Sequence, residues 1–285
     1  MTFTKYYKKT THIVILIFTI IIANLAHPLH AKIASVIGDP VSGEIYFQIN
    51  QDTKNYPASL TKIMTLYIIF EEIRIGNLNL DDEITISKYA NNQQPSKLGL
   101  GVGSKITVDK AIDALIVKSA NDIAVAVAEK IEGSEKKFIK KMNKYSSIMG
   151  LKNTNFANPH GLPNKANLSS ALDMFILSSK IINDYPQYLH RFKKTRTKIK
   201  NKTYKTHNKL LKKYDHYIGL KTGYIRKSGF QISLLRESND QYLLGIYFGG
   251  NSANERNNKI NYLMNKYFNK PESKVIIKSS KKTDL

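Results

Sequence analysis

Polar and apolar residues alternate near the two ends of the chain, whereas in the middle the apolar residues are spaced three or four positions apart. Residues 32–37 and 44–48 alternate as a strand with one buried face does. The turn-forming residues Gly38, Asp39 and Pro40 lie between these two segments, so the pattern predicts a β-hairpin. Three further strands are predicted later in the chain, at 219–224, 230–235 and 242–248.

Between these strands, apolar residues recur three and four positions apart, as on the buried face of a helix. Helices are predicted over 59–73, 107–117, 123–131, 134–149 and 170–182, and a last one over 255–268. A loop rich in Asn, Pro and Gly spans 153–167, and a basic, polar stretch with some alternation spans 190–217. Strands at both ends with helices between them predict an α/β fold whose sheet joins distant parts of the chain.

The first 31 residues have the pattern of a secretory signal peptide. Lys5, Lys8 and Lys9 precede an apolar stretch from 13 to 23, and small residues follow up to Ala31. The apolar stretch is short for a membrane span, so we expect export with cleavage near Ala31; an uncleaved membrane anchor is the alternative. The chain then divides into a signal peptide (1–31), one folded domain (32–270) and a short basic tail (271–285).

Charge and cysteine content narrow the classes of function. The chain has 44 Lys and Arg against 22 Asp and Glu, a net charge of +22, which suggests an anionic partner such as nucleic acid, a membrane surface or an acidic wall polymer. Export removes genomic DNA as a partner, and no basic patch interleaved with aromatic residues indicates nucleic-acid binding. Without cysteine there are no disulfides and no thiolate metal sites, and no pattern indicates a metal or a cofactor.

The segment P-A-S-L-T-K-I-M-T at 57–65 opens an apolar helix with a serine and a lysine three positions apart. A helix brings Ser59 and Lys62 together on one face. Taken alone, Ser59 would be a helix cap and Lys62 a side chain that reaches water. Two further motifs, S-A-N at 119–121 and K-T-G at 221–223, complete the ordered set S-x-x-K, S-x-N and K-T-G of penicillin-recognising serine enzymes.

The likeness extends from residue 32 to about 268, and includes V-K-S-A-N-D-I-A-V-A-V-A-E from 117, N-P-H-G-L-P from 158 and G-L-K-T-G-Y from 219. On these motifs the chain resembles the D-alanyl-D-alanine carboxypeptidases of the low-molecular-mass penicillin-binding protein family. The resemblance implies a β-lactamase/transpeptidase-like fold, with an antiparallel sheet flanked by helices and an inserted all-helical subdomain. It also implies a periplasmic serine peptidase that removes the terminal D-alanine from peptidoglycan stem peptides and that β-lactam antibiotics inhibit covalently.

The resemblance assigns a role to each motif residue. Ser59 is the expected nucleophile, and Lys62 is its expected base, since an amine kept neutral by burial and nearby positive charge can take the serine proton. Ser119 is expected to relay a proton to the leaving amine. The expected substrate-binding residues are Asn121, Lys221, Thr222, Gly223, Tyr224 and Arg256, and the backbone N–H groups of Ser59 and Tyr224 would form the oxyanion hole.

Other polar residues have simpler interpretations. His160 stands in a turn between Pro and Gly and is predicted to be non-catalytic, and His207 and His216 are expected on the surface. Without the resemblance, Arg256 would be a solvated helix charge. Relatives often carry an arginine at the position of His207 and an aspartate at that of Ile218, so we expect the contacts there to differ.

Several alternatives share the same residues. A D,D-endopeptidase or a transpeptidase would use the same acyl-enzyme and differ only in the bond cut or the acceptor. Class A β-lactamases need a glutamate to activate water, and no glutamate lies between Glu135 and Lys221. A wall-binding protein without activity could keep the fold. Since the chain ends soon after the last predicted helix, we expect a single-domain enzyme, soluble in the periplasm or held loosely to an anionic membrane or wall by charge.

Overall fold

The computed structural model describes residues 33–238 and 241–268 of the 285-residue chain. The predicted signal peptide and the predicted basic tail lie outside the described residues, so both stay predictions. Within the described residues, no helix combines the length and apolar character that crossing a bilayer requires.

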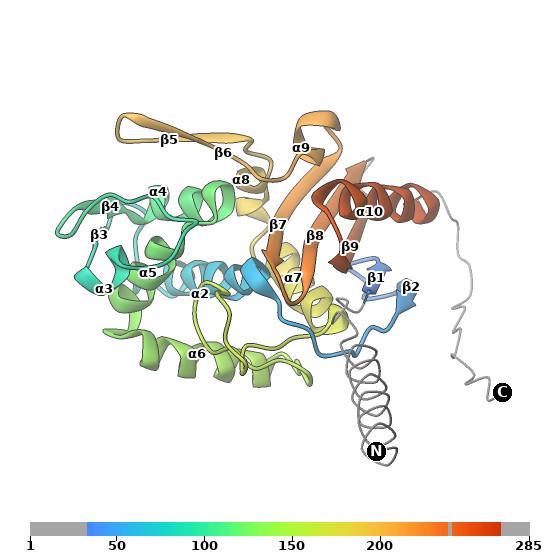
Figure 1. Cartoon of the computed structure of the whole chain (residues 1–285), viewed down its shortest axis with the longest axis horizontal. Coiled ribbons are helices and arrows are strands. Elements are labelled where there is room, and N and C mark those ends of the chain that lie inside the picture. The colour runs from blue at the N-terminus through green and yellow to red at the C-terminus, as the bar shows by residue number, and fades with distance from the viewer. Residues whose placement is uncertain (1–32, 239–240, 269–285) are drawn as a thin grey trace, which may run out of the picture. The chain divides into compact units, whose positions relative to one another are not determined.

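Five strands form one antiparallel sheet in the order β2-β1-β9-β8-β7. The N-terminal hairpin supplies β1 (Ala34–Gly38) and β2 (Ile45–Ile49), and the C-terminal part supplies β7 (Tyr217–Ile225), β8 (Gly229–Ser238) and β9 (Gln241–Gly250). Strand β1 pairs with both β2 and β9, so segments about 200 residues apart lie side by side (Figure 1). The predicted antiparallel sheet built from distant parts of the chain is therefore confirmed.

Helices cover both faces of this sheet. On β9, Leu243 and Tyr247 pack with Ile260 and Met264 of α10 (Ala253–Phe268), whereas the alternate residues belong to the larger core on the other face. That larger core includes α2 (Lys62–Arg74) and α7 (Ala171–Asp184). Gly245 lets α10 approach closely, since a Cβ at this position would lie 2.6 Å from the Met264 sulfur. The predicted helices 59–73, 170–182 and 255–268 are thus present, with slightly different ends.

A helical region is inserted between the two halves of the sheet. It contains α4 (Val108–Asp113), η2 (Ala114–Lys118), α5 (Asn121–Glu132) and α6 (Glu135–Ile148). The side chains of Thr107 and Ser134 accept hydrogen bonds from the backbone N–H groups of Lys110 and Lys137, so these residues cap α4 and α6. In addition, the region carries a short antiparallel pair, β3 (Glu83–Thr85) with β4 (Lys105–Thr107), beside α3 (Lys88–Asn91).

The basic stretch 190–217 forms a second small hairpin with short helices around it. Its strands are β5 (Arg196–Ile199) and β6 (Lys202–Lys205), preceded by η3 (Pro186–Tyr188) and α8 (Leu189–Phe192) and followed by α9 (Leu210–Lys213). Figure 1 shows this hairpin reaching away from the central sheet, and both of its strands contact η2.

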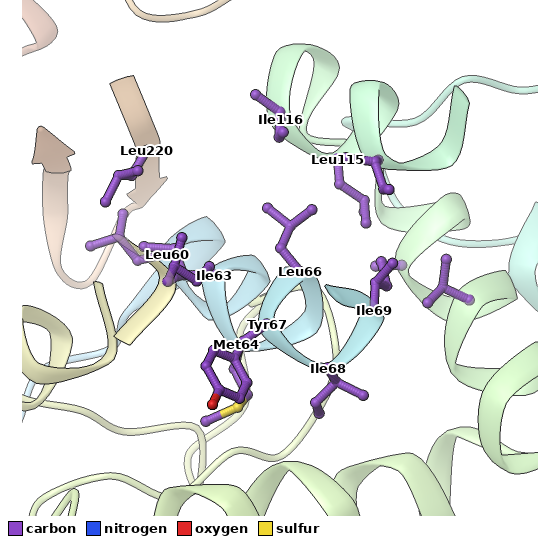
Figure 2. Close-up of a cluster of buried hydrophobic side chains, with 14 of the residues drawn as sticks. Leu60, Ile63, Met64, Leu66, Tyr67, Ile68, Ile69, Leu115, Ile116 and Leu220 are labelled. Atoms are coloured by element: carbon purple, nitrogen blue, oxygen red, sulfur yellow. The ribbon is translucent and has the colours of Figure 1, made fainter. Parts of the chain in front are cut away.

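Helix α2 is surrounded by other elements on all sides. Every residue from Lys62 to Phe70 is buried, which is typical of a helix in the middle of a core. Figure 2 shows Leu66 and Ile69 of α2 near Leu115, and Leu60 near Leu220 of β7. The packing therefore holds the N-terminal end of α2 between the helical region and the edge strand of the sheet.

Candidate active site

The turn that carries Ser59 has a strained backbone held by a neighbouring loop. Ser59 lies in the single 3₁₀ turn η1 (Ala58–Thr61), directly before α2, and Ala58 has a φ of +48°. Gly161 packs against this turn: with a φ of +87°, it has no room for a side chain, because a Cβ would lie 1.7 Å from the carbonyl oxygen of Ala58. The loop at 158–162 thus fixes the position of the serine.

Lys62 is fully buried, and its Nζ contacts three oxygen atoms. It lies 2.7 Å from Asn121 Oδ1, 2.6 Å from the carbonyl oxygen of His160 and 3.4 Å from Ser59 Oγ. Burial, with the positive charge of Lys221 as the second cause, lowers the pKa of Lys62 well below its usual value. A neutral amine has two hydrogens and one lone pair. The two short contacts can take the two hydrogens, which leaves the lone pair for the hydroxyl of Ser59.

The second motif lies where η2 meets α5. Ser119 ends η2 with a φ of +61°, and its buried Oγ has no hydrogen-bond partner within the described residues. Asn121 begins α5; its side-chain amide donates to the carbonyl oxygen of Gln94 at 2.9 Å, while its Oδ1 accepts from Lys62. A buried hydroxyl without a partner is costly in a folded protein, and here it faces a cavity.

The third motif lies on β7, the edge strand of the sheet. Lys221 is only 4% exposed, and burial together with the nearby charge of Arg256 lowers its pKa to about 7. Gly223 packs against η1, since a Cβ there would lie 3.0 Å from Leu60 Cδ1. Tyr224 is 54% exposed and packs on the ring of Phe230. Because β7 is an edge strand, one side of it is free to pair with an extended ligand.

Arg256 is buried, at 2% exposure, so its interpretation as a solvated helix charge is wrong. Its guanidinium donates to the carbonyl oxygen of Gln231 and, through Nε and Nη2, to Asn257 Oδ1. These bonds use three of the five N–H groups of a guanidinium, and the side chain lines the same cavity as Thr222. The burial follows from packing between α10 and β8, which the local sequence does not reveal.

One cavity of about 380 Å³ brings the motifs together. Residues from η1, the end of η2, the start of α5, strand β7 and helix α10 contribute to its wall. Of the predicted site residues, those that line it are Ser59, Ser119, Asn121, Thr222, Gly223, Tyr224 and Arg256. Lys62 and Lys221 lie behind the wall, where Lys62 contacts Ser59 and Asn121. The three motifs are far apart in the sequence but converge in the fold.

The cavity also includes residues that sequence reasoning placed elsewhere. His207 is exposed as a whole residue, as expected, but it lines the cavity, where partial desolvation of its ring and the charges of Lys221 and Lys118 lower its pKa. His160 lines the cavity too; its Nδ1 accepts from the N–H of Leu162, and burial lowers its pKa to about 3. The N-P-H-G-L-P motif, which the chain shares with the family it resembles, was the sequence feature that could have placed His160 at the cavity.

The described part of the chain holds no group of three or more His, Cys, Asp or Glu side chains placed to bind a metal ion. The polar side chains that line the cavity carry hydroxyls, an amide, a guanidinium and two imidazoles. A buried neutral amine next to a serine hydroxyl is the arrangement that activates a serine nucleophile.

Comparison with known proteins agrees with this geometry. Residues 23–249 match the family model described as D-alanyl-D-alanine carboxypeptidase, peptidase S11. The chain is 30% identical over 258 residues to the D-alanyl-D-alanine carboxypeptidase DacF of Bacillus subtilis, covering 87% of this chain. It is 36% identical over 219 residues to DacA of Haemophilus influenzae, covering 75% of this chain.

A solved structure shares the fold. Penicillin binding protein 5 from Haemophilus influenzae superposes with a TM-score of 0.80 and 32% identity, over 85% of this chain and 72% of that one. The chain spans 65% and 56% of the lengths of the Bacillus and Haemophilus carboxypeptidases. The match to the family model covers most of the sequence, and the three motifs meet in one cavity. This chain belongs to the D-alanyl-D-alanine carboxypeptidase family, peptidase S11.

Proposed function

We propose that this protein is a serine-type D-alanyl-D-alanine carboxypeptidase that removes the terminal D-alanine from peptidoglycan stem peptides. The observation that carries the proposal is the contact network of Lys62, which leaves the amine lone pair for Ser59 Oγ. Family membership supports the bond that is cleaved, because the relatives of this chain are named for that activity.

In the proposed reaction, Ser59 Oγ attacks the carbonyl carbon between the two D-alanines, and Lys62 Nζ takes the hydroxyl proton. The developing oxyanion would accept hydrogen bonds from the backbone N–H groups of Ser59 and Tyr224. Ser119, whose Oγ has no other partner in the described structure, would pass the proton to the leaving amine. Water then hydrolyses the acyl-enzyme and releases the shortened peptide.

The free carboxylate of the substrate has a binding place beside β7. Arg256 and Thr222 line one part of the cavity, and a guanidinium pairs well with a carboxylate. Lys221, buried close to Arg256, adds positive charge there and keeps the pKa of Lys62 low. Asn121 would position the substrate amide as well as Lys62, and the backbone of Gly223 would line the place where the peptide lies along β7.

Endopeptidase or transpeptidase action on the same peptides is the alternative, since these reactions share the acyl-enzyme. A β-lactamase is less well supported. No Asp or Glu is among the described residues that line the cavity, and Glu135, whose Oε1 lies 3.7 Å from His160 Nε2, is not part of its wall. We therefore expect slow hydrolysis of a penicilloyl adduct, and β-lactams to act as covalent inhibitors.

The proposal includes the setting in which the enzyme works. Residues 1–31 would direct export to the periplasm and be cleaved near Ala31, or remain as a membrane anchor. Residues 32–270 would form the penicillin-binding peptidase domain, followed by the short tail 271–285. The full chain has a net charge of +22, and removal of residues 1–31 would take away only Lys5, Lys8 and Lys9, so the protein would also associate loosely with anionic membrane or wall material.

Release of D-alanine from a stem pentapeptide ending in D-Ala-D-Ala tests the function directly. We expect D-alanine release from the native protein and none from Ser59→Ala. A peptide with an amidated C-terminus should react much more slowly, because it cannot pair with Arg256.

The same assay separates the alternatives. A cross-linked dimer that is cut faster than the pentapeptide would favour an endopeptidase, and transfer to an added D-amino acid would favour a transpeptidase. A folded native protein that releases nothing from any of these substrates would contradict the proposal.

A further inference from the structure

The excess positive charge of the chain is concentrated around the β5–β6 hairpin. Residues 185–214 contain 11 Lys and Arg and no Asp or Glu. In this segment Arg191, Lys193 and Lys194 have acidic partners elsewhere in the fold. The eight later cations have none within the described residues: Arg196, Lys198, Lys200, Lys202, Lys205, Lys209, Lys212 and Lys213.

The hairpin has an apolar side and a cationic side. Thr197, Ile199 and Tyr204 are buried, and the Tyr204 hydroxyl donates to the carbonyl oxygen of Leu98 in the helical region. Strand residues alternate between faces, so the outward face carries Arg196 and Lys198 on β5, and Lys205 on β6. The structure thus holds the backbone of the hairpin firmly while it exposes the charges.

Like charges oppose each other on this outward face. Arg196 pairs in register with Lys205, directly across the two strands. Such a pair is unfavourable for folding in the absence of an anion, because opposed like charges repel. Asp113 accepts a hydrogen bond from Thr197 on the buried face of the hairpin, but it already pairs with Arg191 and Lys194. Arg196 and Lys205 have no ion-pair partner among the described residues, which leaves the outward face available to an anionic partner.

The arrangement fits an extended anionic surface better than a discrete ligand. The five cations of the hairpin line neither the catalytic cavity nor the two smaller cavities of about 300 and 200 Å³. None of these three cavities therefore gathers the hairpin cations around a single phosphate. Recognition of a single-stranded nucleic acid needs exposed aromatic side chains for stacking, and Tyr204, the aromatic residue of the two strands, is buried.

We propose that the outward face of the β5–β6 hairpin docks the protein on a lipid bilayer that contains anionic phospholipids. This inference names the site and partner of the electrostatic association proposed above, and it does not depend on the reaction. Lys205 precedes His207, which lines the catalytic cavity, by two residues. Docking through the hairpin would therefore bring the cavity close to the bilayer surface, where substrate attached to lipid would be found.

Binding of the full chain to phospholipid vesicles tests the proposal. We would compare cosedimentation with phosphatidylcholine vesicles that contain or lack phosphatidylglycerol, at low and high salt. The test variant is Arg196→Gln/Lys198→Gln/Lys205→Gln. The matched control, Lys136→Gln/Lys140→Gln/Lys144→Gln, removes the same charge from exposed positions of α6. Circular dichroism confirms that both variants are folded.

The native protein should bind the anionic vesicles in a salt-dependent way, beyond any binding to neutral vesicles. Each cation near an anionic bilayer contributes about a fivefold change in affinity. The hairpin variant, which lacks three of them, should therefore bind anionic vesicles on the order of 100-fold more weakly, and the control variant should lose much less affinity. Equal losses in both variants would overturn the proposal. So would binding of soluble polyphosphate through the hairpin without binding to vesicles. Unchanged penicillin acylation in the hairpin variant separates this question from the catalytic proposal.

Discussion

At the scale of single residues, the two lysines of the proposed active site are both buried. Lys62 and Lys221 are 0% and 4% exposed, and neither forms an ion pair among the described residues. An unpaired buried ammonium is unfavourable for folding, so its pKa falls until the neutral form is accessible. The same burial that lowers the pKa of both amines therefore lowers the stability of the folded chain.

Replacing Lys221 by methionine should make the protein more stable and less active. The pKa of Lys221 is lowered from 10.5 to about 7, so between these pH values the unfolded chain binds more protons than the folded chain. The free-energy penalty for burying charged Lys221 is fully present below pH 7 and disappears as the pH rises toward 10.5. Lys221→Met should raise the free energy of unfolding at pH 6 by up to about 5 kcal/mol, measured by urea denaturation.

The pH dependence provides the control for this prediction. The difference in the free energy of unfolding between Lys221→Met and the native protein should decrease steadily between pH 7 and 10. Lys144→Met, at an exposed position on α6, should show no such dependence. A Lys221→Met protein that is less stable than the native one at pH 6 would contradict our account of its burial.

Individual site residues were predictable to different degrees. The motifs S-x-x-K, S-x-N and K-T-G located Ser59, Ser119 and Lys221, because the chemistry restricts which residue types can stand there. The burial of Arg256 was not predictable from its neighbours in sequence. It depends on the carbonyl of Gln231 and on packing between α10 and β8.

At the scale of elements, the position of Ser59, the proposed nucleophile, depends on two segments that contact each other. The strained residue Ala58 begins the turn η1, and Gly161 of the 158–162 loop packs against its carbonyl group. The same loop supplies the His160 carbonyl that accepts from Lys62. Strain of this kind persists only where surrounding packing holds it, so the loop and the turn should respond together to mutation.

Gly161→Ala should impair both stability and acylation. The new Cβ would meet a backbone oxygen at 1.7 Å, so either the loop or the Ser59 turn has to move. We expect a loss of about 3 kcal/mol in the free energy of unfolding, together with a large drop in the rate of penicillin acylation.

Gly150→Ala is the matched control for this experiment. Gly150 has a similar φ of +71°, but nothing lies within 4 Å of a Cβ there. Gly150→Ala should lower the free energy of unfolding by about 1 kcal/mol and leave the rate of penicillin acylation unchanged. If both variants behave alike, the contact with Ala58 does not position the serine.

Most helices and strands followed from the spacing of apolar residues, but their ends and irregular turns did not. The predicted helix 59–73 starts as a 3₁₀ turn, and the predicted helix 107–117 ends in the π-helical turn η2 before Ser119 turns left-handed. These irregular geometries occur where side chains must face the cavity, and local propensity does not favour them. The short β3–β4 pair was missed because each strand has only three residues.

At the scale of the whole domain, the cavity exists because three regions of the chain converge. The turn η1, the junction of η2 with α5, and the edge strand β7 each contribute one motif, and α10 adds Arg256. The sequence pattern predicted strands at both ends, but not that β1 would lie between β2 and β9. That order depends on contacts between segments far apart in the chain, which periodicity does not report.

The central claim is that Ser59 is a nucleophile that forms a long-lived acyl-enzyme. Intact-mass spectrometry of the purified protein after incubation with benzylpenicillin tests it most directly. We expect a stable increase in mass by one benzylpenicillin, mapped to Ser59 and absent from Ser59→Ala. An adduct that forms and disappears within seconds would indicate a β-lactamase instead. The absence of any adduct on the folded native protein, or an adduct that persists in Ser59→Ala, would contradict the account.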